Sequence, residues 1–313
     1  MSKPHILQMG PLTDAFNDRL SALHATDRIW EQQDRDAFLR ETGPQVDIIV
    51  TSARHGCSAD IMAALPNLKV IISFGVGYDP IDIDAARARN IRVSNTPDVL
   101  NDCVADLAMG LMIASARRIA EGDRFVRNGL WGQQPFPLGS RVTGKRLGIL
   151  GLGRIGKCIA RRASGFDMDI RYHNRRPDPG VSFGYEASLV ELAQWADYLV
   201  LTCVGGPSTQ GLVSREVLAA LGPRGTLVNV ARGSVVDQPA LVELLLEGRL
   251  GGAALDVFAE EPQVPAELLE LPQLVLLPHI GSGTHETRRQ MEELVFENLA
   301  SFISRGELVT PVL

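Results

Sequence analysis

The clearest chemical pattern in the sequence is a G-x-G-x-x-G spacing formed by Gly151, Gly153 and Gly156. It directly follows the buried-strand pattern Arg146–Leu150 and opens a helical pattern, Ile155–Ala163. In that context the first glycine permits a tight turn, the second lets the backbone approach a pyrophosphate, and the third lets helix and strand pack closely. The N-terminus of this helix, with its free N–H groups at the positive end of the helix dipole, would then bind the phosphates. The pattern predicts a dinucleotide-binding loop.

The residues after the next strand indicate which dinucleotide is bound. An acidic residue usually ends this strand and holds the ribose 2′-hydroxyl of NAD. Here the predicted strand Asp169–His173 ends in Asn174, Arg175 and Arg176, and Asp178 comes only after a proline. Two adjacent guanidiniums can bind a 2′-phosphate through charge-assisted hydrogen bonds. We therefore expect a preference for NADP(H), with a solvated basic turn as the alternative.

Three further polar residues, Arg232, Glu261 and His279, each follow an apolar run of strand length. Ligands of open α/β sheets bind outside the carboxyl ends of the strands, so these residues are candidates for one site. Taken singly, each also has a structural interpretation: a surface cation, a solvated loop acid and a hydrogen-bonded core histidine.

The elements that must position these residues form two series of short apolar strands alternating with helical patterns. Several strands are apolar on successive residues, which is typical of parallel strands buried on both faces. Ser58 and Ser214 are predicted helix caps, the first for a helix running to Leu65. Residues Asn101 to about Asn128 read as one long helix between the two series, and Thr284 to about Ser304 as an amphipathic last helix. The predicted strands are His5–Met9, Asp47–Val50, Lys69–Ser73 and Ile91–Ser94 in the first series, and Arg146–Leu150, Asp169–His173, Tyr198–Cys203, Thr226–Val230, Ala253–Val257 and Leu274–Leu277 in the second.

Composition excludes several classes of protein. The 313 residues are 45% apolar and 22% charged with a net charge of -6, which fits two globular domains and argues against nucleic-acid binding. No apolar run approaches the roughly 20 residues of a membrane span, and the N-terminal apolar stretch is too short for a secretory signal. Four scattered cysteines suggest neither disulfides nor a metal site, so we expect a cytoplasmic protein.

Five ordered segments together resemble the D-isomer-specific 2-hydroxyacid dehydrogenase family, over a match from about Pro66 to the C-terminus. Within that family, Asn174–Arg176 and Gly281–Arg288 resemble the NADPH-using glyoxylate, hydroxypyruvate and hydroxyphenylpyruvate reductases. The five segments are Phe74–Asp79, Gly151–Gly156, Val228–Ser234, Leu255–Pro262 and Leu277–Thr284.

The resemblance implies a reaction and three catalytic roles. Arg232 matches the arginine that holds the carboxylate of a 2-keto acid and polarises its keto oxygen. His279 matches the acid that protonates the forming alkoxide, and Glu261 the carboxylate that orients this histidine and favours its protonated form. The implied reaction is NADPH-dependent reduction of a small 2-keto acid, of the glyoxylate or hydroxypyruvate type, to the D-2-hydroxy acid.

The resemblance implies further contacts at other strand ends. Val76 and Gly77 would present backbone N–H groups to the substrate carboxylate. Arg54 is a second possible substrate contact, with an exposed loop cation as the alternative. Asp256 matches a residue that bonds the nicotinamide carboxamide, with a purely structural partner as the alternative. By the same resemblance, the N–H groups of Arg154 and Ile155 would bind the pyrophosphate. The remaining predicted cofactor contacts are Cys203, Val230, Ala231 and Gly281.

The expected fold is α/β, with two Rossmann-like parallel-sheet domains and a cleft between them. Residues 101–284 would form the dinucleotide-binding domain, and residues 1–100 with 285–313 a discontinuous, flavodoxin-like substrate domain. A homodimer is expected, in which the Gly- and Pro-rich loop Gly129–Gly139 with Trp131 either contacts the partner chain or is a plain surface loop. Two other functions stay open: formate- or phosphite-type oxidation, which the glutamate at position 261 disfavours, and a dinucleotide-sensing binding protein.

Overall fold

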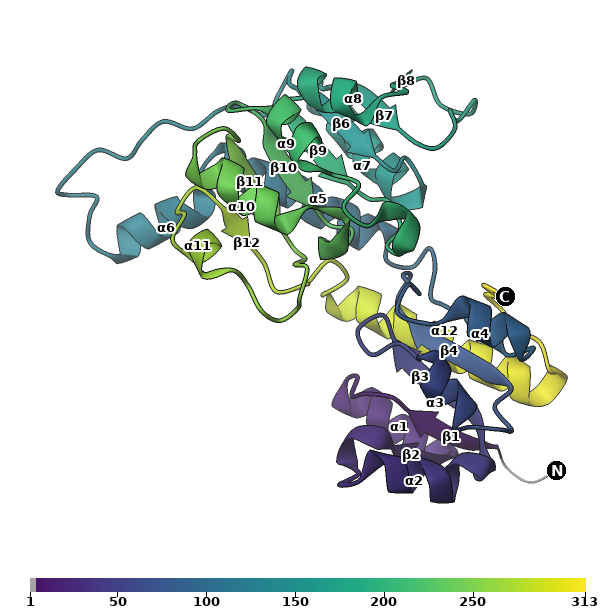
Figure 1. Ribbon diagram of the computed structural model, residues 1–313. Coiled ribbons are helices and arrows are strands. Elements are labelled where there is room, and N and C mark those ends of the chain that lie inside the picture. The colour runs from purple at the N-terminus through teal and green to yellow at the C-terminus, as the bar shows by residue number, and fades with distance from the viewer. Residues whose placement is uncertain (1–3) are drawn as a thin grey trace. The chain divides into compact units, whose positions relative to one another are not determined.

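Parallel β-sheets organise both of the compact units into which the chain divides (Figure 1). The computed structural model describes residues 4–313. One unit comprises the residues up to Leu100 together with His285–Leu313, and the other comprises Asn101–Thr284. Each unit has its own hydrophobic core.

The first unit is built on a five-stranded parallel sheet in the order β2-β1-β3-β4-β5. Its inner strand β4, between β3 and β5, is buried along its whole length because helices cover both faces, which is why the sequence shows a continuous apolar run there. The strands are β1 His5–Gln8, β2 Ala25–Arg28, β3 Val46–Ser52, β4 Val70–Phe74 and β5 Arg92–Ser94. The helices are α1 Asp14–Leu23, α2 Arg35–Thr42, α3 Ala59–Ala63, α4 Ile83–Ala88 and α12 His285–Arg305.

The second unit contains a seven-stranded parallel sheet in the order β12-β11-β10-β9-β6-β7-β8. From β6 the chain proceeds outward to β8, and from β9 it proceeds in the other direction to β12, so the topological switch point lies between β6 and β9. The glycine loop follows β6 and therefore lies at this switch point, where doubly wound sheets bind ligands. The strands are β6 Arg146–Leu150, β7 Asp169–His173, β8 Gly184–Tyr185, β9 Tyr198–Leu201, β10 Thr226–Asn229, β11 Gly252–Leu255 and β12 Val275–Leu276.

Helices α5 and α7 pack against each other and against this sheet through small and aliphatic side chains. Helices α8, α9 and α10 bury leucines in the other core cluster of the unit. The helices are α5 Asn101–Ala116, α6 Ile119–Arg127, α7 Arg154–Ser164, α8 Leu189–Trp195, α9 Arg215–Leu221, α10 Gln238–Leu246 and α11 Ala266–Leu269.

The prediction of one long helix from Asn101 to about Asn128 is wrong. The chain forms two helices, α5 and α6, because Arg118 adopts a left-handed backbone conformation with φ 53°. Its guanidinium pairs with Glu121 in the first turn of α6, with Nε–Oε2 at 2.6 Å. Helix α5 is buried in the core, whereas no residue of α6 is buried. Figure 1 shows α6 and the loop after it projecting from the body of the second unit.

The structure contains two strands that the sequence did not reveal. β2 has the polar sequence Ala-Thr-Asp-Arg, and β8 has only two residues, both exposed. Both lie at sheet edges, where one side of the strand faces solvent and an apolar run is not required.

Both predicted helix caps are confirmed. The Ser58 hydroxyl accepts a hydrogen bond from the Ile61 N–H, and the Ser214 hydroxyl accepts one from the Val217 N–H. The helix after Ser58 ends at Ala63, two residues earlier than predicted. Among residues 4–313, no helix combines the length and the apolar character that a membrane crossing requires.

Candidate active site

The glycine loop after β6 has the geometry that its spacing predicts. Gly151 has φ 97°, and a Cβ there would lie 2.6 Å from the backbone nitrogen of Cys203, at the end of β9. A Cβ on Gly156 would lie 2.5 Å from the Gly151 carbonyl oxygen, so helix α7 and the loop can pack only without it. A Cβ on Gly153 would meet nothing within 4 Å. The backbone at Gly153 is therefore open to a ligand, whereas the other two glycines are enclosed by protein.

Helix α7 begins at this loop without a side-chain cap. Gly153 occupies its N-cap position, so no side-chain oxygen offsets the positive end of the helix dipole. Among residues 4–313, seven other helices have capping side chains: Thr13, Asp34, Ser58, Asp82, Ser188, Ser214 and Asp237. The start of α7 therefore fits an anion such as a diphosphate.

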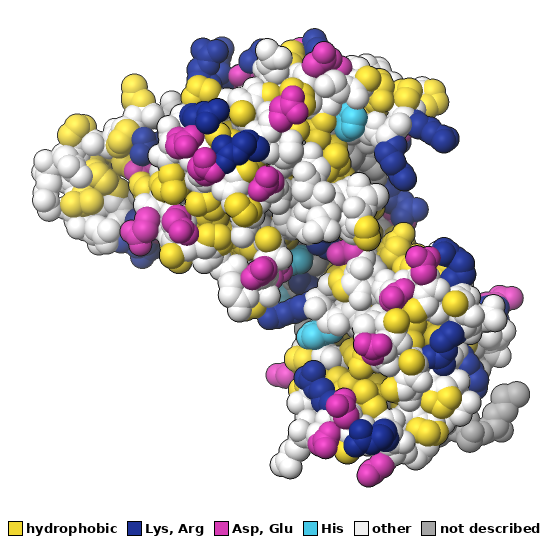
Figure 2. Space-filling view, viewed as in Figure 1, with side chains coloured by type: hydrophobic (Ala, Val, Ile, Leu, Met, Phe, Trp, Pro, Cys, Tyr) yellow, Lys and Arg dark blue, Asp and Glu magenta, His cyan; other side chains and the backbone are white. Residues whose placement is uncertain are grey.

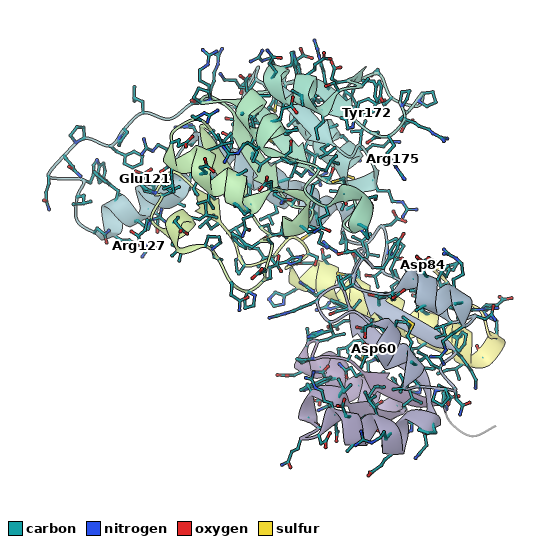
Figure 3. The ribbon with its side chains drawn as sticks, in the orientation of Figure 1. Asp60, Asp84, Glu121, Arg127, Tyr172 and Arg175 are labelled. Carbon is teal, nitrogen blue, oxygen red and sulfur yellow. The ribbon has the colours of Figure 1, made fainter. Side chains whose placement is uncertain are left out.

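The segment after β7 is fixed to the glycine loop. The Leu152 N–H donates a hydrogen bond to Asn174 Oδ1 at 2.8 Å. Arg175, which is labelled in Figure 3, and Arg176 are both exposed, and no ion pair of either is found within residues 4–313. The nearby carboxylate of Asp178 pairs with Lys157 at 2.7 Å, and this hydrogen bond, with a second from the Gly180 N–H, lowers the pKa of Asp178. Asp178, the acidic residue closest in sequence to the two arginines, is thus paired with Lys157 and not with either of them.

His279 and Glu261 form a close pair, with Nδ1 of His279 2.6 Å from Oε2 of Glu261. The other carboxylate oxygen of Glu261 accepts the Phe258 N–H at 3.1 Å. Burial alone would raise the pKa of Glu261, but the hydrogen bond and charge of His279, the Phe258 N–H and the charge of Arg232 together lower it. The carboxylate is therefore ionised at neutral pH and oriented toward the imidazole.

Arg232 is half-buried and lies close enough to Glu261 to influence its ionisation. Its backbone is held by Asn229, the last residue of β10, which donates from Nδ2 to the Arg232 carbonyl at 2.9 Å and accepts the Ala231 N–H at 3.0 Å. Sequence analysis missed Asn229. The sequence feature that could have identified it is a polar residue in an otherwise apolar run, three residues before the arginine.

Close packing of Gly233 brings the arginine turn to the loop that carries Glu261. A Cβ on Gly233 would lie 1.9 Å from the carbonyl carbon of Phe258, three residues before Glu261. Only a glycine fits this approach. The structure therefore brings together Arg232, Glu261 and His279 from the ends of β10, β11 and β12.

Asp256 follows β11 and is nearly fully buried. Its two carboxylate oxygens accept the backbone N–H groups of Ile280 and Gly281. Burial raises the pKa of Asp256, although these two hydrogen bonds and the charge of His279 oppose that shift. In this structure Asp256 contacts the chain after His279, which is the structural alternative that the sequence left open.

The other residues predicted to contact a cofactor, Cys203, Val230 and Ala231, follow β9 and β10. Cys203 is a free thiol whose pKa burial raises to about 11, so it is not a nucleophile at neutral pH. Within residues 4–313, no three His, Cys, Asp or Glu side chains are grouped closely enough to hold a metal ion.

The predicted substrate contacts Val76, Gly77 and Arg54 belong to the first unit. The turn after β4 is anchored by Asn95, whose Nδ2 donates to the Val76 carbonyl at 2.7 Å, and by Thr96, whose N–H donates to the Gly75 carbonyl at 2.9 Å. In the described part of the chain, the N–H groups of Val76 and Gly77 have no hydrogen-bond acceptor. Arg54 is exposed in the turn after β3.

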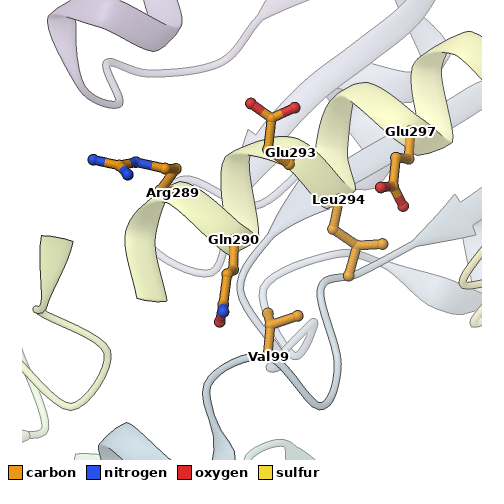
Figure 4. A pocket seen from close by; sticks show the side chains of 6 residues that line it. All are labelled: Val99, Arg289, Gln290, Glu293, Leu294 and Glu297. Carbon is orange, nitrogen blue, oxygen red and sulfur yellow. The ribbon is translucent and has the colours of Figure 1, made fainter. Parts of the chain in front are cut away.

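A groove along α12 in the first unit contains none of the predicted site residues (Figure 4). One of its acidic residues, Glu293, is already paired with Arg19 of α1. The residues that line the groove are Val99, Arg289, Gln290, Glu293, Leu294 and Glu297.

Comparison with known proteins identifies the family. The sequence model described as "D-isomer specific 2-hydroxyacid dehydrogenase, NAD binding domain" matches residues 109–281. The chain belongs to this family. It is 45% identical over 308 residues to a hydroxyphenylpyruvate reductase from Plectranthus scutellarioides, with 98% of each chain covered. It is 42% identical over 312 residues to a 2-ketogluconate reductase from Gluconobacter oxydans, covering 100% of this chain and 99% of that one.

Solved structures of this dehydrogenase family show the same fold. One is an NADPH-dependent glyoxylate/hydroxypyruvate reductase from Sinorhizobium meliloti in complex with NADP and malonate. It matches with a TM-score of 0.94 and 42% identity, over 99% of this chain and 97% of that chain. The family and the α/β fold class with two parallel-sheet units are therefore confirmed.

The glycine loop of this dehydrogenase gives a stability prediction. Gly156→Ala should lower Tm by roughly 2–8 °C, because the added Cβ overlaps the Gly151 carbonyl and overpacking costs about 1–3 kcal/mol. Gly153→Ala is the matched control and should leave Tm unchanged, because its Cβ enters open space. Differential scanning calorimetry of both variants measures the contrast, and equal Tm values would contradict the assigned packing.

Proposed function

We propose that the protein reduces a small 2-keto acid of the glyoxylate or hydroxypyruvate type to the D-2-hydroxy acid, with NADPH as the hydride donor. The observation that carries this proposal is the 2.6 Å pair between His279 and Glu261 with the Arg232 guanidinium beside it. Relatives named as reductases of hydroxyphenylpyruvate, glyoxylate/hydroxypyruvate and 2-ketogluconate support it.

The three side chains fit the two negative charges of keto-acid reduction, the permanent charge of the substrate carboxylate and the charge that develops on the keto oxygen. The Arg232 guanidinium binds the substrate carboxylate and polarises the keto oxygen. Because Nδ1 of His279 donates to Glu261, Nε2 is the nitrogen that gives its proton to the forming alkoxide. Glu261 holds the ring in this orientation and stabilises the imidazolium. The nicotinamide, when bound, supplies the hydride.

In the second unit, residues at the carboxyl ends of β6, β7, β9 and β10 fit a dinucleotide. The uncapped start of α7 and the open backbone at Gly153 would bind the pyrophosphate, with Arg154 and Ile155 as donors. Arg175 and Arg176 would bind the 2′-phosphate of NADPH, on a segment whose Asn174 holds the glycine loop. The remaining proposed backbone contacts are Cys203, Val230, Ala231 and Gly281. We therefore assign dinucleotide binding to residues 101–284.

In the first unit, the turn after β4 fits a substrate carboxylate. The N–H groups of Val76 and Gly77 lack an acceptor within the described residues, and such a pair of donors can bind an anion. Arg54 offers a further cation in the neighbouring turn, since the Ala53 N–H bonds the Phe74 carbonyl at 3.3 Å. We therefore assign substrate binding to this unit.

An assay with both dinucleotides tests the reaction and the cofactor. NADPH oxidation is followed at 340 nm with glyoxylate, hydroxypyruvate, phenylpyruvate and 2-ketogluconate. Arg175→Gln and Arg176→Gln should each lower the NADPH/NADH ratio of kcat/KM by about 10- to 100-fold, the value of a charge-assisted hydrogen bond. Arg171→Gln, a nearby arginine stacked on Trp195, is the control and should keep the ratio. A preference for NADH would refute the cofactor assignment, and no turnover of any 2-keto acid would favour a dinucleotide-sensing role.

The His279–Glu261 pair predicts a pH dependence. His279→Gln should lower kcat by about 10²–10⁴-fold while the Kd for NADPH stays near wild type. Because its pKa is lowered, Glu261 stays ionised through weakly acidic pH, so its support of the imidazole should persist there and be lost only at more strongly acidic pH, where activity should fall. Glu261→Gln removes the carboxylate at every pH, so it should lower kcat and abolish this acid fall. The adjacent exposed Glu260→Gln is the control, and a fully active His279→Gln enzyme would refute the acid role.

We also propose that the protein is a homodimer that pairs through α6 and the loop after it. Trp131 and Leu138 in this loop are 74% and 96% exposed, and Ile119 and Val126 of α6 are exposed as well. Figure 2 shows hydrophobic side chains over this projecting segment, and Figure 3 labels Glu121 and Arg127 on α6. Light scattering should give twice the mass of one chain, and Trp131→Ser with Leu138→Ser should halve it. A monomeric wild-type protein would contradict the proposal.

A further inference from the structure

We infer that Tyr172 and Tyr185 are positioning residues for dinucleotide selectivity, because their hydroxyl groups hold the turn that presents Arg175 and Arg176. The inference rests on the proposed function of these two arginines as the 2′-phosphate site. Tyr172 lies in β7, and Figure 3 labels it together with Arg175, while Tyr185 lies in β8. Both hydroxyls act on backbone groups of the turn.

The hydroxyl of Tyr172 makes both of its hydrogen bonds with one residue of the turn. Tyr172 is 1% exposed. Its hydroxyl accepts the Asp178 N–H at 2.8 Å and donates to the Asp178 carbonyl over a longer 3.4 Å. The hydroxyl therefore fixes the backbone of Asp178, which follows Arg176 and Pro177 in the sequence.

Tyr185 holds the other end of the turn. Its hydroxyl donates to the Asn174 carbonyl at 3.2 Å, while the Asn174 side chain accepts the Leu152 N–H of the glycine loop. The parallel pairing of β7 and β8 places Tyr185 opposite Tyr172, and the two rings meet edge to face with their centroids 5.5 Å apart. The short strand β8 thus brings a second hydroxyl to the turn.

Between the two held residues, Asn174 and Asp178, the backbone has little freedom. Only three residues separate them, and the last of these is Pro177, whose ring restricts φ to about −65°. Lys157 of α7 adds a link at the same end, because its Nζ lies 2.7 Å from Oδ2 of Asp178. The backbone of the two arginines is thus ordered before a ligand binds, and this reduces the entropy cost of binding.

A held turn of this kind acts on NADPH and not on NADH. The two dinucleotides differ only in the 2′-phosphate, and the groups assigned to that phosphate are the two guanidiniums. A looser turn should therefore weaken the binding of NADPH and leave that of NADH unchanged. A general loss of core packing would instead weaken both dinucleotides together, so the two effects can be told apart.

Tyr172→Phe tests the inference, because it removes the hydroxyl and keeps the ring. We expect the NADPH/NADH ratio of kcat/KM to fall by about 3- to 10-fold, the range of a neutral hydrogen bond, with kcat/KM for NADH unchanged. Calorimetric titration should show the same loss of affinity for adenosine 2′,5′-bisphosphate and none for 5′-AMP, without any turnover being needed.

Tyr185→Phe is the second test, at a position that is 37% exposed and tolerates substitution more readily. It should lower the NADPH/NADH ratio in the same direction, and it replaces Tyr172→Phe if that variant does not fold. An unchanged ratio in the folded variants, or an equal loss of kcat/KM with both dinucleotides, overturns the inference.

A double-mutant cycle separates this inference from the proposed function. In an enzyme that already carries Arg175→Gln and Arg176→Gln, Tyr172→Phe should have no further effect on the ratio, because no guanidinium remains to be positioned. If the arginine substitutions leave the ratio unchanged, the proposed 2′-phosphate site fails. If they lower it but Tyr172→Phe has the same effect in both backgrounds, only the positioning role fails.

Tyr198→Phe is the matched control for loss of a buried hydroxyl. Tyr198 of β9 belongs to the same core cluster as Tyr172, and no hydrogen bond of its hydroxyl is found in the described part of the chain. This variant should keep both the ratio and the affinity for adenosine 2′,5′-bisphosphate. A fall of the ratio as large as in Tyr172→Phe would attribute the effect to the core and overturn the inference.

Discussion

Parallel pairing of β6, β9, β10, β11 and β12 is the constraint on which the candidate site depends. Because the strands run in one direction, their carboxyl ends lie along one edge of the sheet, and whatever follows each strand is brought to that edge. The glycine loop, the arginine turn and the histidine segment are separated by many residues in sequence, yet each begins where one of these strands ends. Any change of register or strand order would separate them.

This constraint explains why so much of the fold could be predicted. Strands buried on both faces need apolar residues at successive positions, so ten of the twelve strands in the described part of the chain are visible as short apolar runs. The polar or glycine residues that interrupt those runs then mark the site. The exceptions have physical reasons: β2 and β8 are edge strands with little to bury, and the break at Arg118 depends on one backbone dihedral and a local ion pair.

The candidate site was harder to predict at the level of individual contacts. The types of Arg232, Glu261 and His279 indicated what each could do, but the partners of Asn229 and Asp256 are backbone N–H and C=O groups. Every residue except proline carries both groups, so no sequence pattern predicts which of them will bind a given side chain. Sequence therefore identifies the groups that act on a substrate more readily than the groups that hold them in place.

The divided first unit has a consequence for synthesis of the chain. Helix α12 buries Met291, Val295 and Leu299 against a sheet made from the first hundred residues, and the Val312 N–H bonds the Val93 carbonyl. During synthesis the part of that sheet that α12 covers stays exposed until residues 285–313 emerge, whereas residues 101–284 are contiguous and can fold first. The apolar surface that α12 will cover therefore stays exposed while residues 101–284 are synthesised, and such a surface is the kind that chaperones bind.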